Sequence, residues 1–374
     1  MSFHIPCPAE PGMPVAEVDT PALLLDLAAF DSNLDRMDAS LAGKQIRLRP
    51  HAKSHKCPEI ALRQMAHGAV GVCCQKVTEA EAMVAGGIPD VLISNQVVGA
   101  RKIERLMALA QRVRVSVLVD DAANVAALND AAARHKVTLN VLVEVNVGAN
   151  RCGVPPGKAA SALARTVVSS THLRFRGIHA YQGAAQHVRS AEERQVLIAR
   201  AVQMVSDTTA LLEAAGIKCE IVTGAGTGTY LLEAASGVYN ELQPGSYIFM
   251  DADYARNLRE DGETVQVFSH SLFVWTSVMS HTKPGRAIVD AGLKALSVDS
   301  GMPVVAQAGA EYLGASDEHG VLRVDDASSY PLGHKLRLIP GHCDPTVNLH
   351  DWIVGYRGQT VEAVWPITAR GALF

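Results

Sequence analysis

The sequence predicts an α/β fold, a (β/α)8 barrel of the TIM type, followed by a β-rich C-terminal domain. Two observations lead to this prediction. From about residue 46, eight short β-rich runs alternate with helical patterns, and several runs are apolar almost throughout, as buried parallel strands are. After about residue 260 the helical patterns stop, and strand-like runs separated by turns follow. We therefore expect a barrel over 28–260 and a β-rich domain made of 1–27 and 261–374.

The barrel elements follow from these patterns one by one. In 30–41 the apolar residues recur on one helical face, and Thr78 with Glu81 has the spacing of a capping box before a helix that ends at 86–87. An open doubly wound sheet of the Rossmann type would need Gly-x-Gly-x-x-Gly after its first strand, and none occurs there. The expected barrel strands are 46–49, 70–74, 90–94, 113–119, 139–146, 175–180, 219–223 and 240–249.

The C-terminal part is expected to form a sheet without a long helix. Its runs alternate or are rich in β-branched and aromatic residues, with turn residues between them. The expected strands are 265–279, 287–290, 320–324, 335–339, 352–356 and 359–365, with the run at 22–27 as a candidate further strand.

Composition excludes several classes of protein. The chain has 374 residues, 48% of them hydrophobic, and a formal charge of -4, so it has no basic field to attract nucleic acid. No apolar run reaches the roughly 18 to 20 residues that span a bilayer, and 1–14 has four prolines and no signal-peptide pattern. Seven cysteines without a Cys-x-x-Cys pair disfavour both a disulfide framework and a cysteine-rich zinc site. We expect a cytoplasmic protein with neither a nucleic-acid nor a membrane partner.

Lys53 is the first candidate for chemistry. Barrel enzymes carry their reactive groups at the carboxyl ends of the strands, and the first expected strand runs into Arg-Pro-His-Ala-Lys-Ser-His-Lys at 49–56. A lysine that forms a Schiff base must be partly desolvated, so that some neutral amine exists. The alternative is a solvated lysine in a basic loop, and this segment alone does not exclude it.

Two glycine-rich segments lie at the ends of later strands. Arg151 is bracketed by glycines after the fifth expected strand, where an arginine can donate to a phenolate-type oxygen such as O3 of pyridoxal phosphate, although it can equally be a surface residue. Thr-Gly-Ala-Gly-Thr-Gly-Thr at 223–229 offers amides and hydroxyls for a phosphate, or is a flexible turn. The amides of Gly245 and Ser246 could complete the phosphate site.

Together these segments resemble alanine racemase and its relatives, in which they occur in the same order. The resemblance implies that Lys53 is the Schiff-base lysine of pyridoxal phosphate and that Arg151 contacts O3. One departure is that an arginine facing the pyridine nitrogen is replaced here by Gln243, which leaves the protonation of that nitrogen open. The cofactor-binding residues implied are Lys53, Arg151, Tyr181, Thr223, Gly224, Gly226, Thr227, Gln243, Gly245 and Ser246.

A candidate metal site follows the expected strand at 335–339. If Gly-His-Cys-Asp at 341–344 is extended, residues two apart face the same side, so His342 and Asp344 point together while Cys343 points away. An imidazole with a carboxylate suits Mn²⁺, Mg²⁺ or Co²⁺. An isolated His-x-Asp also occurs for purely structural reasons.

Over nearly its full length the chain resembles the D-threonine aldolase and D-3-hydroxyaspartate aldolase group. The stretches that carry this resemblance are 49–56, 71–76, 151–153, 180–187, 245–254 and 341–351. It implies a divalent metal, foremost Mn²⁺, on His342 and Asp344, and a place for His187 as a catalytic base near that metal. The related dehydratases carry His-x-Cys and zinc, so Asp344 favours cleavage over dehydration.

The sequence thus predicts a lyase that uses pyridoxal phosphate and a metal to cleave a small D-3-hydroxy amino acid, D-threonine or D-3-hydroxyaspartate, to glycine and an aldehyde. The resemblance also implies a homodimer. Two alternatives are an elimination enzyme on the same scaffold and a non-catalytic pyridoxal-phosphate carrier. The β-rich C-terminal part and its His-x-Asp argue against the carrier. The choice between the two substrates stays open.

Overall fold

Eight parallel strands form a closed barrel in the computed structural model, which describes residues 6–374. The sheet runs in the order β2-β9-β8-β7-β6-β5-β4-β3, and its two ends join where His51 bridges Cys73 and the Cys73 amide donates to the Pro50 carbonyl (2.8 Å). The predicted barrel is therefore confirmed. Its strands are β2 (Arg47–Leu48), β3 (Val72–Cys74), β4 (Asp90–Gln96), β5 (Arg114–Val119), β6 (Leu139–Glu144), β7 (Leu173–His179), β8 (Ile221–Gly224) and β9 (Glu241–Leu242).

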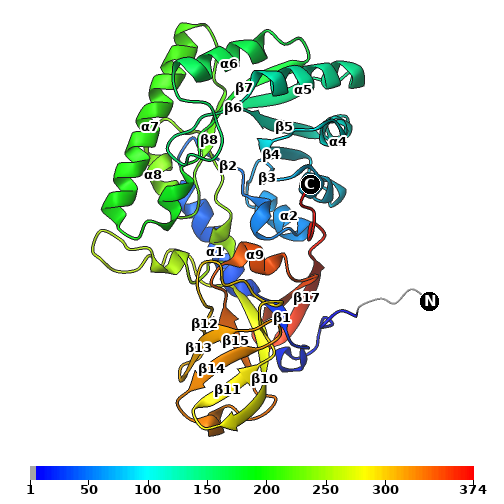
Figure 1. Ribbon diagram of the computed structural model, residues 1–374, viewed down its shortest axis with the longest axis vertical. Coiled ribbons are helices and arrows are strands. Elements are labelled where there is room, and N and C mark those ends of the chain that lie inside the picture. Colours follow the sequence, from blue (N-terminus) through cyan, green and yellow to red (C-terminus); the bar gives the residue numbers. More distant parts are fainter. Residues whose placement is uncertain (1–5) are drawn as a thin grey trace, which may run out of the picture.

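Helices pack around the outside of this barrel, and α7 runs along one side of it (Figure 1). The predicted apolar face of α1 is buried, and Asp26 caps this helix by accepting from the amides of Ala28 and Ala29. The barrel interior is filled by a small cluster of Cys73, Leu92, Leu118, Leu142 and Ile221. The helices of this part are α1 (Leu27–Leu41), α2 (Pro58–Ala66), α3 (Val77–Ala85), α4 (Ala100–Ala110), α5 (Ala122–His135), α6 (Lys158–Val168), α7 (Ala191–Ala214) and α8 (Tyr230–Ala235).

Two local predictions in the barrel are wrong. The capping box is absent, because α3 already begins at Val77 and the Thr78 hydroxyl donates instead to the Phe374 carbonyl (2.6 Å). The strand expected at 240–249 ends at Leu242, because Pro244 has no amide to continue a ladder and a 3-10 turn follows at Ser246–Ile248.

The second sheet holds the C-terminal strands and the predicted N-terminal strand. β1 pairs antiparallel with β10 and parallel with β16, so the candidate strand at 22–27 is confirmed. The strand expected at 265–279 begins only at Leu272, and the short strands β12 and β13 were not predicted. The strands are β1 (Ala22–Asp26), β10 (Leu272–Lys283), β11 (Arg286–Val289), β12 (Val304–Val305), β13 (Ala310–Ala315), β14 (Gly320–Val324), β15 (Lys335–Ile339), β16 (Trp352–Arg357) and β17 (Thr360–Pro366).

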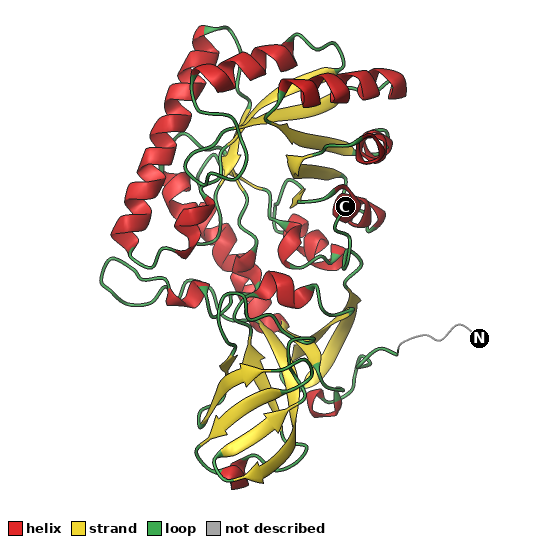
Figure 2. Cartoon of the chain, in the orientation of Figure 1, coloured by secondary structure: helices red, strands yellow, loops and turns green. Residues whose placement is uncertain are grey.

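A short helix, α9 (Cys343–Val347), lies where the barrel meets this second sheet (Figure 1). Figure 2 shows helices around the barrel and mostly strands in the other part. The exact limits, 28–260 against 1–27 with 261–374, stay a prediction, and 1–5 lie outside the described residues. Within residues 6–374 no helix is long and apolar enough to cross a membrane, and the seven cysteines are free thiols.

Candidate active site

Lys53 lies in a 3-10 turn, Ala52–Ser54, directly after β2, and contacts the β-rich part through α9. Its Nζ forms an ion pair with the carboxylate of Asp344. Burial favours the neutral amine, but the charge and hydrogen bond of Asp344 outweigh it and raise the pKa of Lys53. Burial alone would raise the pKa of Asp344, but the positive charge of Lys53 and, less strongly, that of His342 lower it to about 2. The two residues therefore form a charged pair at neutral pH.

One pocket at the carboxyl ends of the strands gathers most of the predicted cofactor residues. Arg151 lies there over the Tyr181 ring, with its guanidinium carbon 5.7 Å from the ring centroid. Thr223 and Gly224 do not line the pocket but lie behind it on β8, where the Thr223 hydroxyl and the Gly224 carbonyl each accept from Gln243 (2.8 Å). The predicted residues that line the pocket are Lys53, Arg151, Tyr181, Gly226, Thr227, Gln243, Gly245 and Ser246.

The two glycine-rich loops have the properties of a phosphate site. A Cβ at Gly226 would lie 2.5 Å from Gln186 Oε1, and one at Gly245 would lie 2.5 Å from Ser54 Oγ, so a side chain at either position would have to displace its neighbour. Within the described chain, the buried hydroxyl of Thr227 has no hydrogen-bond partner. Backbone amides of two loops that line the pocket, together with this unpaired hydroxyl, suit a phosphate. A lysine beside such a site fits pyridoxal phosphate.

The pocket also contains polar residues that the sequence reasoning missed. His51 Nε2 lies 2.9 Å from Gln75 Nε2 and 3.1 Å from Ser94 Oγ, on the same side as Lys53. His179 lines the other side, where it contacts Gln243. Ser94 and His179 are polar residues at the ends of apolar strand runs, which is the signal that could have identified them.

His342 and Asp344 reach the site by a different backbone path from the predicted one. The segment is not extended throughout, because His342 is the N-cap of α9 and Asp344 is in its first turn. Cys343 is buried, and its thiol donates to the Met250 carbonyl (3.6 Å), away from Asp344. The structure thus brings Asp344 to Lys53 and His342 to Asp299, whose carboxylate lies 2.8 Å from His342 Nδ1.

These two side chains fit a divalent cation. Asp344 Oδ1 is buried and, in the part of the chain that is described, accepts no hydrogen bond. The Asp299 carboxylate on Nδ1 of His342 leaves Nε2 for a ligand, as is usual for metal-binding histidines. A second group, Asp120, Glu144 and Cys152, has ligand atoms within 4.8 Å of one another. Its carboxylates already accept from Gly153 and Gln96, so this group is explained by loop anchoring.

His187 lies near the mouth of the pocket without lining it. Its side chain is half-exposed, its ring centroid is 5.6 Å from that of Tyr254, and its Nδ1 lies 2.5 Å from Asp253 Oδ2. Burial would raise the pKa of Asp253, but hydrogen bonds from Arg189, His187 and Arg256 lower it. Asp253 is therefore a carboxylate that orients the His187 ring.

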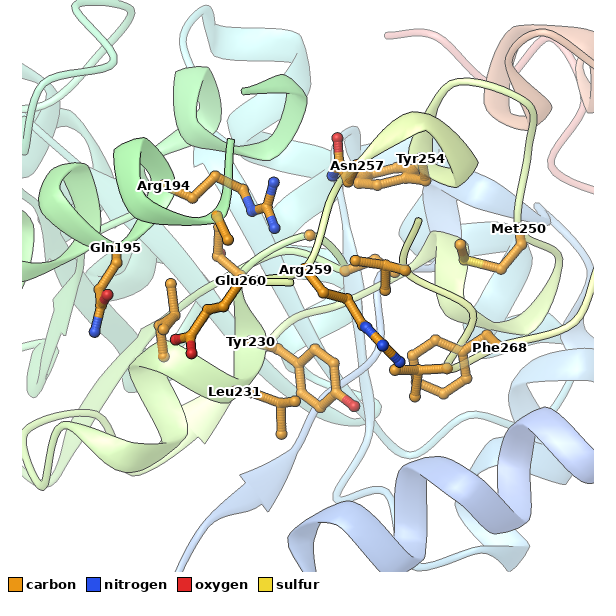
Figure 3. Close-up of a pocket in the computed structure, with 17 residues that line it drawn as sticks. Arg194, Gln195, Tyr230, Leu231, Met250, Tyr254, Asn257, Arg259, Glu260 and Phe268 are labelled. Atoms are coloured by element: carbon orange, nitrogen blue, oxygen red, sulfur yellow. The ribbon is translucent and has the colours of Figure 1, made fainter. Parts of the chain in front are cut away.

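Figure 3 shows a second cavity, whose volume is about 290 Å³. Thr227 and Tyr254 line both this cavity and the first. Its wall is largely apolar and includes Tyr230 and Phe268. Arg194 of α7 also lines it, but its guanidinium donates to the backbone carbonyls of 188, 189 and 258. This cavity lies behind the phosphate site and contains neither Lys53 nor the candidate metal ligands.

Comparisons with known proteins agree with this geometry. Residues 25–253 match the family model "Alanine racemase, N-terminal domain", and 271–356 match "Putative serine dehydratase domain". The 3-hydroxy-D-aspartate aldolase of Paracoccus denitrificans (strain Pd 1222) is 47% identical, over 97% of this chain and 95% of that protein. The D-threonine aldolase of Arthrobacter sp is 48% identical, over 98% and 97%. The crystal structure of D-threonine aldolase from Filomicrobium marinum has a TM-score of 0.95 at 53% identity, over 98% of this chain and 100% of that chain.

Proposed function

This chain belongs to the family of D-threonine and 3-hydroxy-D-aspartate aldolases, and from that premise we propose that it cleaves D-3-hydroxy amino acids to glycine and an aldehyde. It is an enzyme, a carbon–carbon lyase with an alanine-racemase-like barrel. The observation that carries the proposal is the position of Lys53, which lies in the pocket with the phosphate site and contacts the candidate metal ligand Asp344.

Pyridoxal phosphate would be held by Lys53 at its aldehyde carbon, by the two glycine-rich loops at its phosphate and by Arg151 at O3, and its ring would draw electrons from Cα. Lys53 must give up a proton before its amine can act as a nucleophile, and breaking its ion pair with Asp344 would remove the charge that holds this proton. Arg151, lying over Tyr181, brings a charged donor to the pocket wall.

The candidate metal ligands and His187 would act on the substrate's β-hydroxyl. His342 and Asp344 would hold a divalent cation, foremost Mn²⁺ with Mg²⁺ or Co²⁺ as alternatives, that lowers the pKa of this hydroxyl. His187 is the candidate base, because its Nδ1 faces the Asp253 carboxylate and carries a proton there. Its Nε2 then offers a lone pair to the hydroxyl proton. Arg189 and Arg256 fix Asp253 and thereby the His187 ring.

Aldol cleavage is favoured over elimination by the residue at 344. Elimination enzymes that resemble this chain carry cysteine there, whereas here the carboxylate of Asp344 faces the pocket side and Cys343 is buried against Met250.

The chain would act as a cytoplasmic homodimer, and size-exclusion chromatography tests that assembly. The cytoplasmic location and the limits of the two domains are part of the same proposal.

The products formed from D-threonine and D-3-hydroxyaspartate test the function. We expect glycine and an aldehyde in equal amounts from at least one of them when pyridoxal phosphate and Mn²⁺ are present, and neither product from L-threonine. Ammonia with a keto acid would show elimination instead. A protein that binds the cofactor but forms none of these products would be a carrier, and the proposal would be wrong.

A further inference from the structure

Gln186 is a fully buried residue whose side chain contacts the phosphate loop, 225–229. Its Oε1 accepts from the Gly228 amide (3.0 Å), and its Nε2 donates to the Thr229 hydroxyl (2.8 Å) and to the Gln182 carbonyl (3.3 Å). A backbone amide can only donate and a backbone carbonyl can only accept, so these contacts fix which end of the side chain is oxygen. Because its carbonyl and both of its N–H groups are used, the buried side chain is held in one orientation.

The glycines of the phosphate loop are explained by the space that Gln186 occupies. A Cβ at Gly226 would lie 2.5 Å from Gln186 Oε1, and a Cβ at Gly228 would lie 2.8 Å from the Gln186 carbonyl oxygen. Gly226 and Thr227 line the Lys53 pocket, and Gly228 lines the second cavity. Gln186 therefore anchors the loop through Gly228, while the Thr227 hydroxyl, which has no partner among the described residues, stays available to a phosphate.

The backbone of Gln186 continues directly into the candidate base. Gln186 and His187 are the last two residues of the 3-10 turn Gly183–His187. The Gln186 carbonyl accepts from Nδ2 of the buried Asn257 (3.0 Å), which is labelled in Figure 3. Asn257 belongs to the same segment as Asp253, whose carboxylate lies 2.5 Å from His187 Nδ1. The turn is thus held on one side by the phosphate loop and on the other by the segment that orients the base.

The side chain and the backbone of Gln186 fix different parts of the site. The side chain sets the distance between the phosphate loop and the turn, and the backbone sets the point at which the His187 side chain begins. A displacement of the loop therefore displaces His187 with it. A base must lie within roughly 2.6–3.2 Å of the group whose proton it takes, so a shift of about 1 Å is enough to slow the transfer.

We propose that Gln186 is a positioning residue that joins the phosphate loop to His187, so that the bound phosphate and the base for the β-hydroxyl keep a fixed relative position. This inference rests on the proposed function, because it takes pyridoxal phosphate as the group bound by the loop and His187 as the base. Gln186 does not line the Lys53 pocket, and it acts through the two elements that it connects.

The affinity for pyridoxal phosphate and the cleavage rate of Gln186→Met test the two halves of the proposal. Methionine keeps the length of the side chain and loses its hydrogen bonds. We expect the Kd of pyridoxal phosphate, measured by absorbance titration of the apoenzyme, to rise about tenfold, as for the loss of one or two neutral hydrogen bonds. With saturating pyridoxal phosphate and Mn²⁺, kcat on the better of D-threonine and D-3-hydroxyaspartate should fall up to about 100-fold, while KM stays near the wild-type value.

A double-mutant cycle with His187→Asn separates positioning from general damage to the site. In the His187→Asn background, Gln186→Met should lower kcat no further, because the base that Gln186 positions is already absent. His187→Asn alone should leave the Kd of pyridoxal phosphate at the wild-type value. Gln203→Met is the matched control, because it makes the same change at an exposed position of α7 and should alter neither Kd nor kcat.

Additive losses of kcat in the double variant, in protein that is an active aldolase, would overturn this inference and leave the proposed function intact. An unchanged Kd in Gln186→Met would also overturn it. Wild-type protein that cleaves neither substrate would overturn the proposed function and this inference together. If Gln186→Met does not fold, Gln186→Glu decides the question in the same assays, because it keeps an acceptor for the Gly228 amide and loses both donors.

Discussion

Glu233 supports the phosphate loop from α8, and its charge state leads to a quantitative prediction. It is 2% exposed and accepts from the Thr229 hydroxyl (2.9 Å) through Oε1, while Oε2 has no partner among the described residues. Burial raises the pKa of Glu233 from 4.5 to about 7, although the Thr229 hydrogen bond opposes this rise. The folded protein therefore keeps this proton at a pH at which the unfolded chain has released it.

The size of the effect follows from that rise. One pKa unit corresponds to about 1.4 kcal/mol, so a rise from 4.5 to about 7 is worth about 3 kcal/mol. Because the folded state binds the proton more tightly, this stability is fully present below pH 4.5 and is lost as the pH rises through about 7. Glu233→Gln keeps the neutral shape without a proton to lose. We expect it to be more stable than wild type by up to about 3 kcal/mol at high pH.

Urea denaturation of the holoenzyme, followed by circular dichroism at about pH 5 and about pH 8, measures this difference. Glu192→Gln removes an exposed glutamate in the first turn of α7 and should leave the pH dependence of wild type unchanged. Parallel pH dependence in wild type and Glu233→Gln would refute a protonated Glu233. At about pH 8, the affinity for pyridoxal phosphate should also be higher in Glu233→Gln than in wild type, because the Glu233 carboxylate behind the phosphate loop would repel the phosphate.

Three further predictions concern the cofactor and the metal. Arg151→Ala should weaken pyridoxal-phosphate binding by roughly 1.5–3 kcal/mol, seen as a higher Kd in absorbance titration, and an unchanged Kd would mean that Arg151 points elsewhere. Chelation should abolish D-threonine cleavage but leave the yellow colour, and added Mn²⁺ should restore cleavage; full activity in chelated protein would exclude the metal role. Asp344→Cys should shift the metal preference toward zinc in a binding assay. The control Cys343→Ser should keep the wild-type preference. An equal change in both variants would mean that Asp344 is not the metal ligand.

The fold could be predicted largely because its signals are local. Apolar strand runs and amphipathic helices repeat along 46–249, and closure into a barrel follows from their number and order. The course of 341–347 could not be predicted in the same way, because His342 is extended and the helix begins one residue later. Pro345 in the first turn of α9 was the available signal, since proline is tolerated at that point of a helix. The strand β12 has only two residues, too few for a clear alternation. The six residues of β13 include Gly314 at a register shift, which weakens their strand pattern.

The candidate site was predicted where the sequence has a motif and missed where only the fold brings residues together. Lys53 and the glycine-rich loops are identified by their neighbours in sequence, and the pocket unites them. Gln75, Ser94 and His179 are single polar residues on three different strands or strand ends, so no spacing identifies them. Their place in the pocket depends on barrel closure, which also sets Glu144 at the end of β6 beside His179 at the end of β7.

The position of the covalently bound cofactor tests the central claim, that the Lys53 pocket is the active site, most directly. Holoenzyme that cleaves D-threonine would be reduced with borohydride, digested and mapped by mass spectrometry. We predict a phosphopyridoxyl group on Lys53, with cleavage activity lost in proportion to its incorporation. A label on Lys56 or Lys76, or undiminished activity after complete labelling of Lys53, would contradict the assignment of this pocket.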